Sequence, residues 1–172
     1  MRAPELAARY ERLLAEHGPA LRRVAGSYEA DRALREDLFQ DICLAIWQAL
    51  PKFRGDSSER TFIFRIGHNR GLSHSWRRRP AATDLDEAEA MADPLPGPEA
   101  AANASQRRKR LRAAVRSLPL AARQVVSLSL EGVSQREIGD ILGIRENNVA
   151  VRLHRAKAAL RRALESSGKG SL

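Results

Sequence analysis

"SQREIGDILGIRENNVAVRLHRAKAAL", residues 134–160, contains the pattern that decides the fold. Ser134 and Glu137 have the spacing of a capping box, which predicts the start of a short helix. Gly143 is expected to end that helix, and a longer helix is expected to begin near Glu146 only a few residues later. Two helices joined by so tight a turn predict a helix-turn-helix.

The longer helix has an inward and an outward face. Apolar residues recur at helical spacing at Val149, Leu153, Ala156 and Leu160. The outward positions are then Asn147, Val151, His154 and Arg155, with Asn148 and Ala150 beside them. This face is expected to lie in a major groove of DNA. Asparagine amides pair bidentately with adenine, while Ala150 and Val151 can pack against thymine methyl groups, so the face favours A·T base pairs.

A third helix is expected directly before this pair. Pro119 can open it at its first turn, and Gly132 can close it. Its apolar face consists of Val125, Val126, Leu128 and Leu130.

The first half of the chain is also expected to be helical. Leu34, Leu38, Ile42, Ala45, Ile46 and Ala49 form one apolar stripe, which Pro51 ends. Two shorter helices are expected before it, separated by Gly18 and Pro19, which we interpret as helix breakers. A further helix is expected after the turn "KFRGDSSE", through residues 60–79.

That last helix combines arginines with aromatic residues. Residues 60–79 contain six Arg and no acid, together with Phe62, Phe64 and Trp76. Cations that follow phosphates and rings that stack on bases both suit single-stranded DNA. The alternative is that the aromatic residues are core and the arginines are solvated, and we expect Phe62 and Ile66 to be core.

Composition narrows the function classes. The chain has 30 Lys and Arg against 21 Asp and Glu, a formal charge of +9, which favours a polyanionic partner, nucleic acid ahead of an acidic membrane surface. No apolar run is long enough to span a membrane and no signal peptide is evident, so we expect a cytoplasmic protein without membrane insertion. The single Cys43 excludes an internal disulfide and is expected in the core.

The charge reverses between the two halves. Residues 81–103 carry six acids and no Lys or Arg, with Pro94, Pro96 and Pro98 close together. Proline disfavours helix in the preceding residue, so this stretch is predicted to be a linker between two domains. The alternative, a long surface loop within one domain, is uncommon in compact proteins.

Together these segments resemble the extracytoplasmic-function (ECF) group of the sigma-70 family of RNA polymerase sigma factors. "REDLFQDICLAIWQALPKFRGDSSERTFIFRIGHNR" resembles the group's region 2, and "LPLAARQVVSLSLEGVSQREIGDILGIRENNVAVRLHRAKAALR" resembles its region 4. The resemblance implies an all-α fold with region 2 at residues 1–79, a flexible acidic linker at 80–104 and region 4 at 105–172. It implies an alternative sigma factor that binds core RNA polymerase, recognises the minus-35 and minus-10 promoter elements and assists promoter melting.

The resemblance also assigns roles to residues. The chain would bind core polymerase through the clamp coiled coil and the flap of the polymerase's two large subunits. A face of carboxylate and amide side chains would make this contact, consisting of Glu36, Asp37, Gln40 and Asp41. Trp47 matches a residue that the family uses mainly in packing. Contact with the minus-10 element, including capture of a flipped base, would use Arg54, Gly55, Asp56, Ser57, Phe62, Phe64, Arg65, Asn69, Arg70, Arg77 and Arg78. Contact with the minus-35 element would use Arg145, Asn147, Asn148, Ala150, Val151, Arg152, His154 and Arg155.

This sequence departs from the family pattern at three places. Phe62, Ile63 and Phe64 stand where Trp-Leu-Tyr is usual, and Ser73 stands where Asp is common. Ala150 and Val151 replace a commoner Arg and Ser pair, so the promoter sequence of a relative cannot be transferred directly. The resemblance leaves open whether an anti-sigma factor binds this chain.

Two other function classes compete with this interpretation. An enzyme is disfavoured because the four His residues show no metal-ligand spacing and no phosphate-binding glycine loop occurs, so no metal or cofactor is expected. An ordinary regulator would use only the helix-turn-helix on DNA, but a sensor domain would not need the arginine-rich helix of residues 60–79. A basic helical protein that binds RNA or other proteins through charge alone would leave the turn chemistry of residues 134–144 unexplained.

Overall fold

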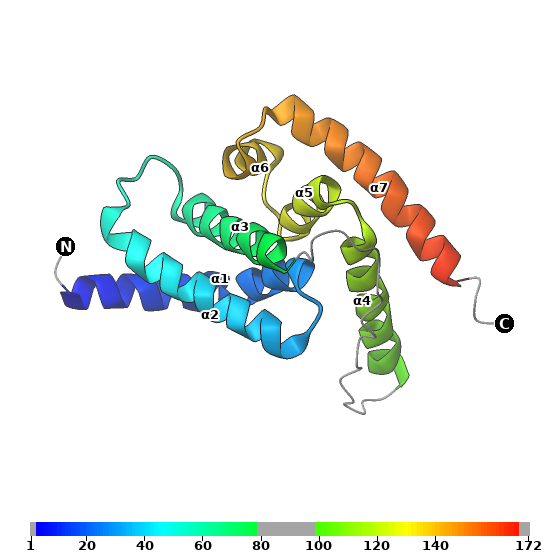
Figure 1. Cartoon of the computed structure of the whole chain (residues 1–172), viewed down its shortest axis with the longest axis horizontal. Coiled ribbons are helices and arrows are strands. Elements are labelled where there is room, and N and C mark those ends of the chain that lie inside the picture. Colours follow the sequence, from blue (N-terminus) through cyan, green and yellow to red (C-terminus); the bar gives the residue numbers. More distant parts are fainter. Residues whose placement is uncertain (1–2, 79–98, 169–172) are drawn as a thin grey trace.

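The computed structural model describes residues 3–78 and 99–168, and every regular element in these two ranges is a helix (Figure 1). The elements are α1 (Ala3–Tyr28), α2 (Arg32–Ala49), the short 3₁₀ helix η1 (Leu50–Lys52), α3 (Glu59–Arg77), α4 (Glu99–Ser117), α5 (Leu120–Leu130), α6 (Gln135–Leu142) and α7 (Glu146–Gly168). This confirms the predicted all-α fold. No helix in the described ranges is long and apolar enough to cross a membrane.

Helices α1, α2 and α3 pack against one another and form the N-terminal half. The apolar stripe predicted for α2 supplies part of their shared core, and its helix begins where Asp31 accepts a hydrogen bond from the amide of Leu34 at 2.9 Å. The largest fully buried side chains of this half are Leu13, Leu21, Leu38, Ile42, Ile46, Leu50, Ile63 and Phe64. Cys43 is buried, as predicted.

The prediction of two short helices before α2 is wrong, because α1 is one continuous helix with Pro19 inside it. A proline inside a helix lacks the amide hydrogen that would bind the carbonyl four residues earlier, its ring clashes with that carbonyl, and the ring also clashes with the Cβ of the preceding residue. Here that residue is Gly18, which has no Cβ. Pro19 and Ala15 are both exposed, so water can reach the Ala15 carbonyl that lacks its usual amide partner. The supposed breaker pair is therefore compatible with a helix.

Helices α4 to α7 form the C-terminal half, in which α5 and α6 pack on α7 and α4 packs on both α5 and α7. Val125, Leu128, Ile138 and Val149 are fully buried or nearly so. Helix α4 was not predicted as an element, although Leu111, Val115 and Leu118 recur at helical spacing and pack into the core. The proposed linker lies mostly outside the described residues, and α4 begins at Glu99 within its last part. The domain boundaries remain a prediction.

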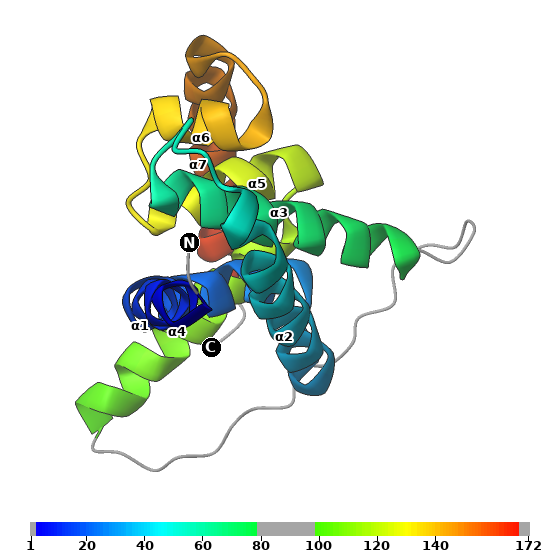
Figure 2. The ribbon, with the colours of Figure 1, turned by 90° about the vertical axis from the view of Figure 1, so that its left-hand side faces the viewer.

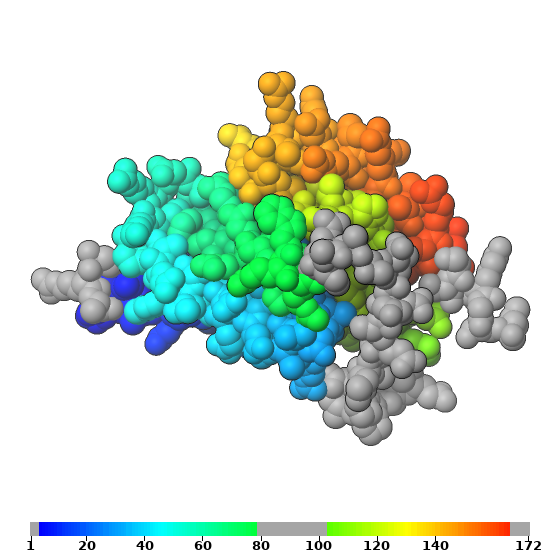
Figure 3. Space-filling view, in the orientation of Figure 1, coloured from blue at the N-terminus to red at the C-terminus, as the bar shows by residue number. Residues whose placement is uncertain are grey.

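The two halves touch each other directly. Helix α3 contacts α6, and α1 contacts both α4 and α5. Figure 2 shows α3 lying between α2 and the helices α5 and α6. In the space-filling view the described surface passes from α3 to α6 without a gap (Figure 3). The contact joins α3, which carries residues assigned to the minus-10 element, to α6, the first helix of the helix-turn-helix.

Candidate nucleic-acid interface

Helix α7 presents the outward face that the sequence predicted. Val149, Leu153 and Ala156 are buried against α5 and α6, and Leu160 is half-buried against the core. Most predicted reading residues are exposed: Arg145, Asn147, Asn148, Ala150, Val151, His154 and Arg155. Arg152 is half-buried. The exposed residues supply two amides, two guanidinium groups and the apolar side chain of Val151, which is 49% exposed. This face can therefore form both hydrogen bonds and apolar contacts in a DNA groove.

The turn before α7 is fixed by local chemistry. Ser134 Oγ accepts a hydrogen bond from the Glu137 amide at 3.2 Å, and the Glu137 carboxylate accepts one from the Ser134 amide at 3.0 Å, which confirms the capping box. The Ser134 hydroxyl also donates to the Glu137 carboxylate at 2.7 Å, and this hydrogen bond, followed by the one from the Ser134 amide, lowers the pKa of Glu137. Gly143 ends α6 in the left-handed conformation, with φ 68° and ψ 32°.

Gly139 was not singled out from the sequence, yet this turn depends on it. A Cβ built at Gly139 would lie 2.7 Å from the carbonyl oxygen of Ile144, which is closer than real Cβ contacts. The amide of Ile144 also donates to the Gly139 carbonyl at 3.0 Å. The absence of a side chain at position 139 therefore lets the chain pass close to α6 before α7 begins. A glycine within the amphipathic pattern of residues 135–142 was the available signal.

The loop before α3 is anchored at its base and exposed at its tip. Ser58 caps α3 by accepting a hydrogen bond from the Thr61 amide at 3.0 Å. Glu59 binds Arg9 at 2.6 Å and Arg12 at 2.8 Å on α1, and these arginines, Arg12 first, lower the pKa of Glu59. The predicted loop residues Arg54, Gly55 and Asp56 are exposed, and Ser57 is half-buried. These contacts fix the base of the loop, while its polar tip is exposed.

The aromatic surface predicted for α3 is partly wrong. Phe64 is 0% exposed and faces the core, so its ring cannot stack on a base in this structure. Phe62 is half-buried and packs on Phe53 with ring centroids 4.5 Å apart, which confirms its expected core role, as does the partial burial of Ile66. Trp76 is the aromatic residue that α3 does expose, at 62%. The physical reason is that Phe64 and Ile63 lie on the side of α3 that meets α1 and α2.

The polar residues predicted on α3 fall into two groups. Asn69, Arg70 and Arg77 are exposed. Arg65 is half-buried, and its guanidinium donates to the Asp140 carbonyl of α6 at 3.0 Å. Arg78 is bound to the carboxylate of Glu29. The structure therefore leaves part of the proposed minus-10 surface open and engages the rest within the protein.

Glu29 ties the end of α3 to the end of α1. Burial would raise the pKa of this carboxyl group, but hydrogen bonds from His74 at 2.8 Å and from the Asp31 amide at 2.9 Å, with the charge of Arg78, outweigh burial and lower it. Six residues before His74, burial lowers the pKa of His68 to about 4, and the His68 ring is hydrogen-bonded to Tyr28. His68 is thus a neutral core residue.

The face proposed for core polymerase lies on the outer side of α2. Glu36, Asp37, Gln40 and Asp41 are all exposed, and Glu36 forms an ion pair with Arg22. Two apolar residues extend this face: Leu44 is 54% exposed and Trp47 is 38% exposed. Trp47 also packs edge-on against Tyr10, with centroids 5.2 Å apart, so it combines the predicted packing role with an exposed edge.

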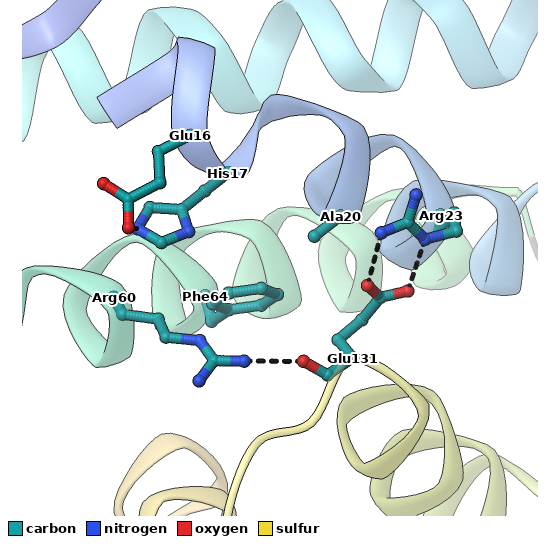
Figure 4. A pocket seen from close by; sticks show the side chains of 7 residues that line it. All are labelled: Glu16, His17, Ala20, Arg23, Arg60, Phe64 and Glu131. Carbon is teal, nitrogen blue, oxygen red and sulfur yellow. Dashed lines mark hydrogen bonds and ion pairs between the residues drawn. The ribbon is translucent and has the colours of Figure 1, made fainter. Parts of the chain in front are cut away.

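A cavity of about 340 Å³ lies where the two halves meet (Figure 4). Its lining consists of Glu16, His17, Ala20, Arg23, Arg60, Phe64 and Glu131. The Glu131 carboxylate accepts two hydrogen bonds from Arg23, both at 2.7 Å, and its backbone carbonyl accepts one from Arg60. No sequence signal pointed to these contacts, because Arg23 and Glu131 are 108 residues apart. Within the described residues, no group of three His, Cys, Asp or Glu could hold a metal ion.

Comparisons with known proteins match both halves of the chain. A family model described as Sigma-70 region 2 matches residues 13–80, and one described as Sigma-70, region 4 matches residues 108–160. The RNA polymerase sigma factor NccH of Alcaligenes xylosoxydans xylosoxydans is 34% identical over 164 residues, which cover 92% of this chain and 88% of NccH. The ECF RNA polymerase sigma-E factor of Escherichia coli K12 is 29% identical over 134 residues, covering 72% of this chain and 70% of that factor.

The arrangement of the helices also has a counterpart among solved structures. The structure of CnrH in complex with the cytosolic domain of CnrY matches with a TM-score of 0.68 and 28% sequence identity. The match covers 94% of this chain and 96% of CnrH. The similarity thus extends over both halves together.

Proposed function

This chain belongs to the sigma-70 family, as an ECF alternative sigma factor that directs promoter-specific transcription initiation, and we propose how its surfaces divide that work. Helix α2 binds core RNA polymerase, α3 and the loop before it recognise and help melt the minus-10 element, and α7 reads the minus-35 element. The observation that carries this proposal is that one chain presents a helix-turn-helix reading face and a separate arginine-rich face with an exposed Trp76.

The two DNA faces suit different forms of DNA. The outward side of α7 has the width and the side chains for a duplex major groove. The exposed Asn69, Arg70 and Trp76 of α3 suit a melted strand, because unpaired bases can stack on an indole ring and be held by an amide. The polar tip at Arg54 and Asp56 would then complete a pocket for one flipped base.

The outer face of α2 suits a cationic partner. Asp37, Gln40 and Asp41 lie on it without another residue covering them, and Leu44 adds an apolar contact. We assign this face to the clamp coiled coil of core polymerase, and the C-terminal half to the flap. Because CnrH was solved in complex with the cytosolic domain of CnrY, we extend the proposal to a second protein that binds this chain, and an anti-sigma factor is the kind of partner that the sequence left open.

We propose that the chain acts by binding core polymerase and promoter DNA rather than by catalysing a reaction, and that it acts in the cytoplasm. Both assignments follow from the partners, since core polymerase supplies the chemistry of RNA synthesis and is found with the promoter DNA in the cytoplasm.

Binding to core polymerase from the protein's own organism tests the proposal. The measurement is the dissociation constant of the labelled chain, and we expect Asp41→Lys to weaken binding at least tenfold. Glu11→Lys is the matched control, since it makes the same charge change at an exposed position of α1, and it should leave binding within twofold. If the unaltered chain does not bind core polymerase, the account fails in favour of an ordinary DNA-binding regulator.

A further inference from the structure

Four arginines from three helices gather beside the end of α1. We call them the arginine cluster: Arg35 of α2, Arg112 and Arg116 of α4, and Arg123 of α5. Helices α4 and α5 contact each other and both contact α1 (Figure 1). A Cβ built on Gly26 of α1 would lie 3.4 Å from the Cδ of Arg35, and Arg123 donates to the carbonyl of the next residue, Ser27, at 3.3 Å. The side chains from α2 and α5 thus reach adjacent residues of α1.

Helix α4 brings two arginines to the same place. Arg112 and Arg116 are four residues apart, so they share one face of this helix. Arg123 donates to the carbonyl of Leu118, two residues beyond Arg116, at 3.2 Å. Burial lowers the pKa of Arg116, and the charges of the other three arginines lower it further. The members of the cluster are therefore close enough to repel one another.

Within the described ranges, no carboxylate forms an ion pair with the arginine cluster. Other arginines do have such partners, because Arg9, Arg22 and Arg23 each bind a glutamate. The charge of Glu29 acts on Arg116, but that carboxylate is already bound by His74, Arg78 and the Asp31 amide. The cluster thus carries positive charge that the described side chains do not neutralise.

Arg123 also contains a buried donor that no described group satisfies. Its two terminal nitrogens donate to the carbonyls of Ser27 and Leu118, whereas its Nε is buried without a hydrogen-bond partner. Leaving a buried donor unpaired is costly, and the cost is larger for a charged group. An acceptor that comes from outside the chain would remove this cost.

The chemistry of the cluster favours a phosphate group as that acceptor. Guanidinium groups present N–H donors in a planar fork that matches phosphate oxygens. Three of the four arginines are half-buried, and Arg112 is the exposed member. Partly enclosed donors suit a compact anion, whereas the long backbone of a nucleic acid would follow exposed cations, such as Arg107 and Arg108 on the same helix.

We propose that the arginine cluster is a binding site for the phosphate or diphosphate group of a small molecule. None of its four arginines belongs to the residues assigned to core polymerase or to promoter DNA. The site therefore gives the chain a ligand besides these partners, and it does not depend on the proposed function.

Binding of inorganic pyrophosphate to the full chain tests the site. Isothermal titration calorimetry gives the dissociation constant, with the ionic strength held constant by KCl so that screening stays the same. We expect Arg116→Gln to weaken binding about tenfold. Arg116→Lys should weaken it less, because lysine keeps the charge and loses only the fork.

Arg110→Gln is the matched control for this series. It makes the same charge change at an exposed position of α4. Arg110 is two residues from Arg112, which places it about 200° away around the helix axis at about 100° per residue. This variant should leave pyrophosphate binding within about twofold of the unaltered chain, because only nonspecific attraction depends on it.

Thermal unfolding gives a second readout that a structural role would not reproduce. Without pyrophosphate, the Tm of Arg116→Gln should equal or exceed that of the unaltered chain, because one of four repelling charges is gone. Pyrophosphate should raise the Tm of the unaltered chain and of Arg110→Gln but not that of Arg116→Gln, since a ligand of the folded form stabilises it. If Arg116→Gln does not fold, Arg112→Gln at its exposed position gives the same readouts.

Four results would overturn the proposal. The first is that millimolar pyrophosphate does not bind the unaltered chain, and the second is that Arg110→Gln weakens binding as much as Arg116→Gln. The third is that pyrophosphate binds only after the six acids of residues 81–103 are changed to amides, since the chain's own carboxylates would then fill the cluster. The fourth is that a duplex without promoter elements displaces pyrophosphate and loses affinity in Arg116→Gln, which would make the cluster a nucleic-acid site.

Discussion

Replacing Gly139 by Ala should destabilise the helix-turn-helix and weaken minus-35 binding. The new Cβ would lie 2.7 Å from the Ile144 carbonyl oxygen, and because this is a backbone atom in a tight turn, the turn itself must move. Overpacking of this kind costs about 1–3 kcal/mol. Moving the turn also weakens the hydrogen bond from the Ile144 amide to the Gly139 carbonyl, worth about 1 kcal/mol. The better helix propensity of alanine returns about 1 kcal/mol, so the net loss is about 2 kcal/mol.

The matched control is Gly26→Ala in α1. A Cβ there meets only the Arg35 side chain, at an ordinary 3.4 Å, so the propensity gain of about 0.5–1 kcal/mol should appear without strain. Thermal unfolding should therefore show a Tm about 4–8 °C lower for Gly139→Ala and about 1–4 °C higher for Gly26→Ala, at roughly 2–4 °C per kcal/mol. Duplex binding should weaken only for Gly139→Ala. An unchanged or raised Tm for Gly139→Ala would refute the close approach that the structure places at Gly139.

Three further predictions concern DNA and pH. Asn69→Ala should reduce permanganate reactivity of the promoter bubble while leaving closed-complex binding nearly unchanged, because a flipped base exists only after melting. Ser73→Ala is the control, since Ser73 is exposed on the same helix. Unchanged permanganate reactivity of the Asn69→Ala bubble would count against the Asn69 pocket. Arg155→Ala should lower duplex affinity and reduce the slope of log K against log salt by about one if it binds a phosphate, whereas an unchanged slope means a base contact or none. The pKa of Glu29 lies below the ordinary 4.5, so the ionised carboxylate stabilises the fold fully above pH 4.5, and this stabilisation is lost as the pH falls through the lowered pKa. Urea unfolding from pH 6 to pH 3 should therefore show a steeper loss of unfolding free energy for the unaltered chain than for Glu29→Gln. Parallel curves would contradict the Glu29 network.

Local chemistry made part of the fold predictable. The capping box at Ser134, the left-handed Gly143 and the stripe through Val149 act within a few residues, so their sequence spacing already defines helix ends and faces. The continuous α1 was missed because Gly18 and Pro19 were both interpreted as helix breakers, although Gly18 has no Cβ to clash with the proline ring and the Ala15 carbonyl is exposed to water.

Contacts between distant residues were not predictable in this way. Whether Phe64 faces the core or solvent depends on how α1 and α2 pack on α3, which the period of α3 alone does not determine. The binding of Glu131 by Arg23 depends on how the halves dock, and no local pattern in either segment encodes it. The residues assigned to the minus-10 and minus-35 elements remain predictions until DNA binding is measured.

Run-off transcription with core polymerase over genomic fragments tests the central claim most directly. The account predicts transcripts from a small set of start sites that core polymerase alone does not use, with an upstream element rich in A·T pairs, in keeping with the amide and apolar face of α7. The absence of new start sites, with freshly refolded chain and active core polymerase, would contradict the claim that this chain directs promoter-specific initiation.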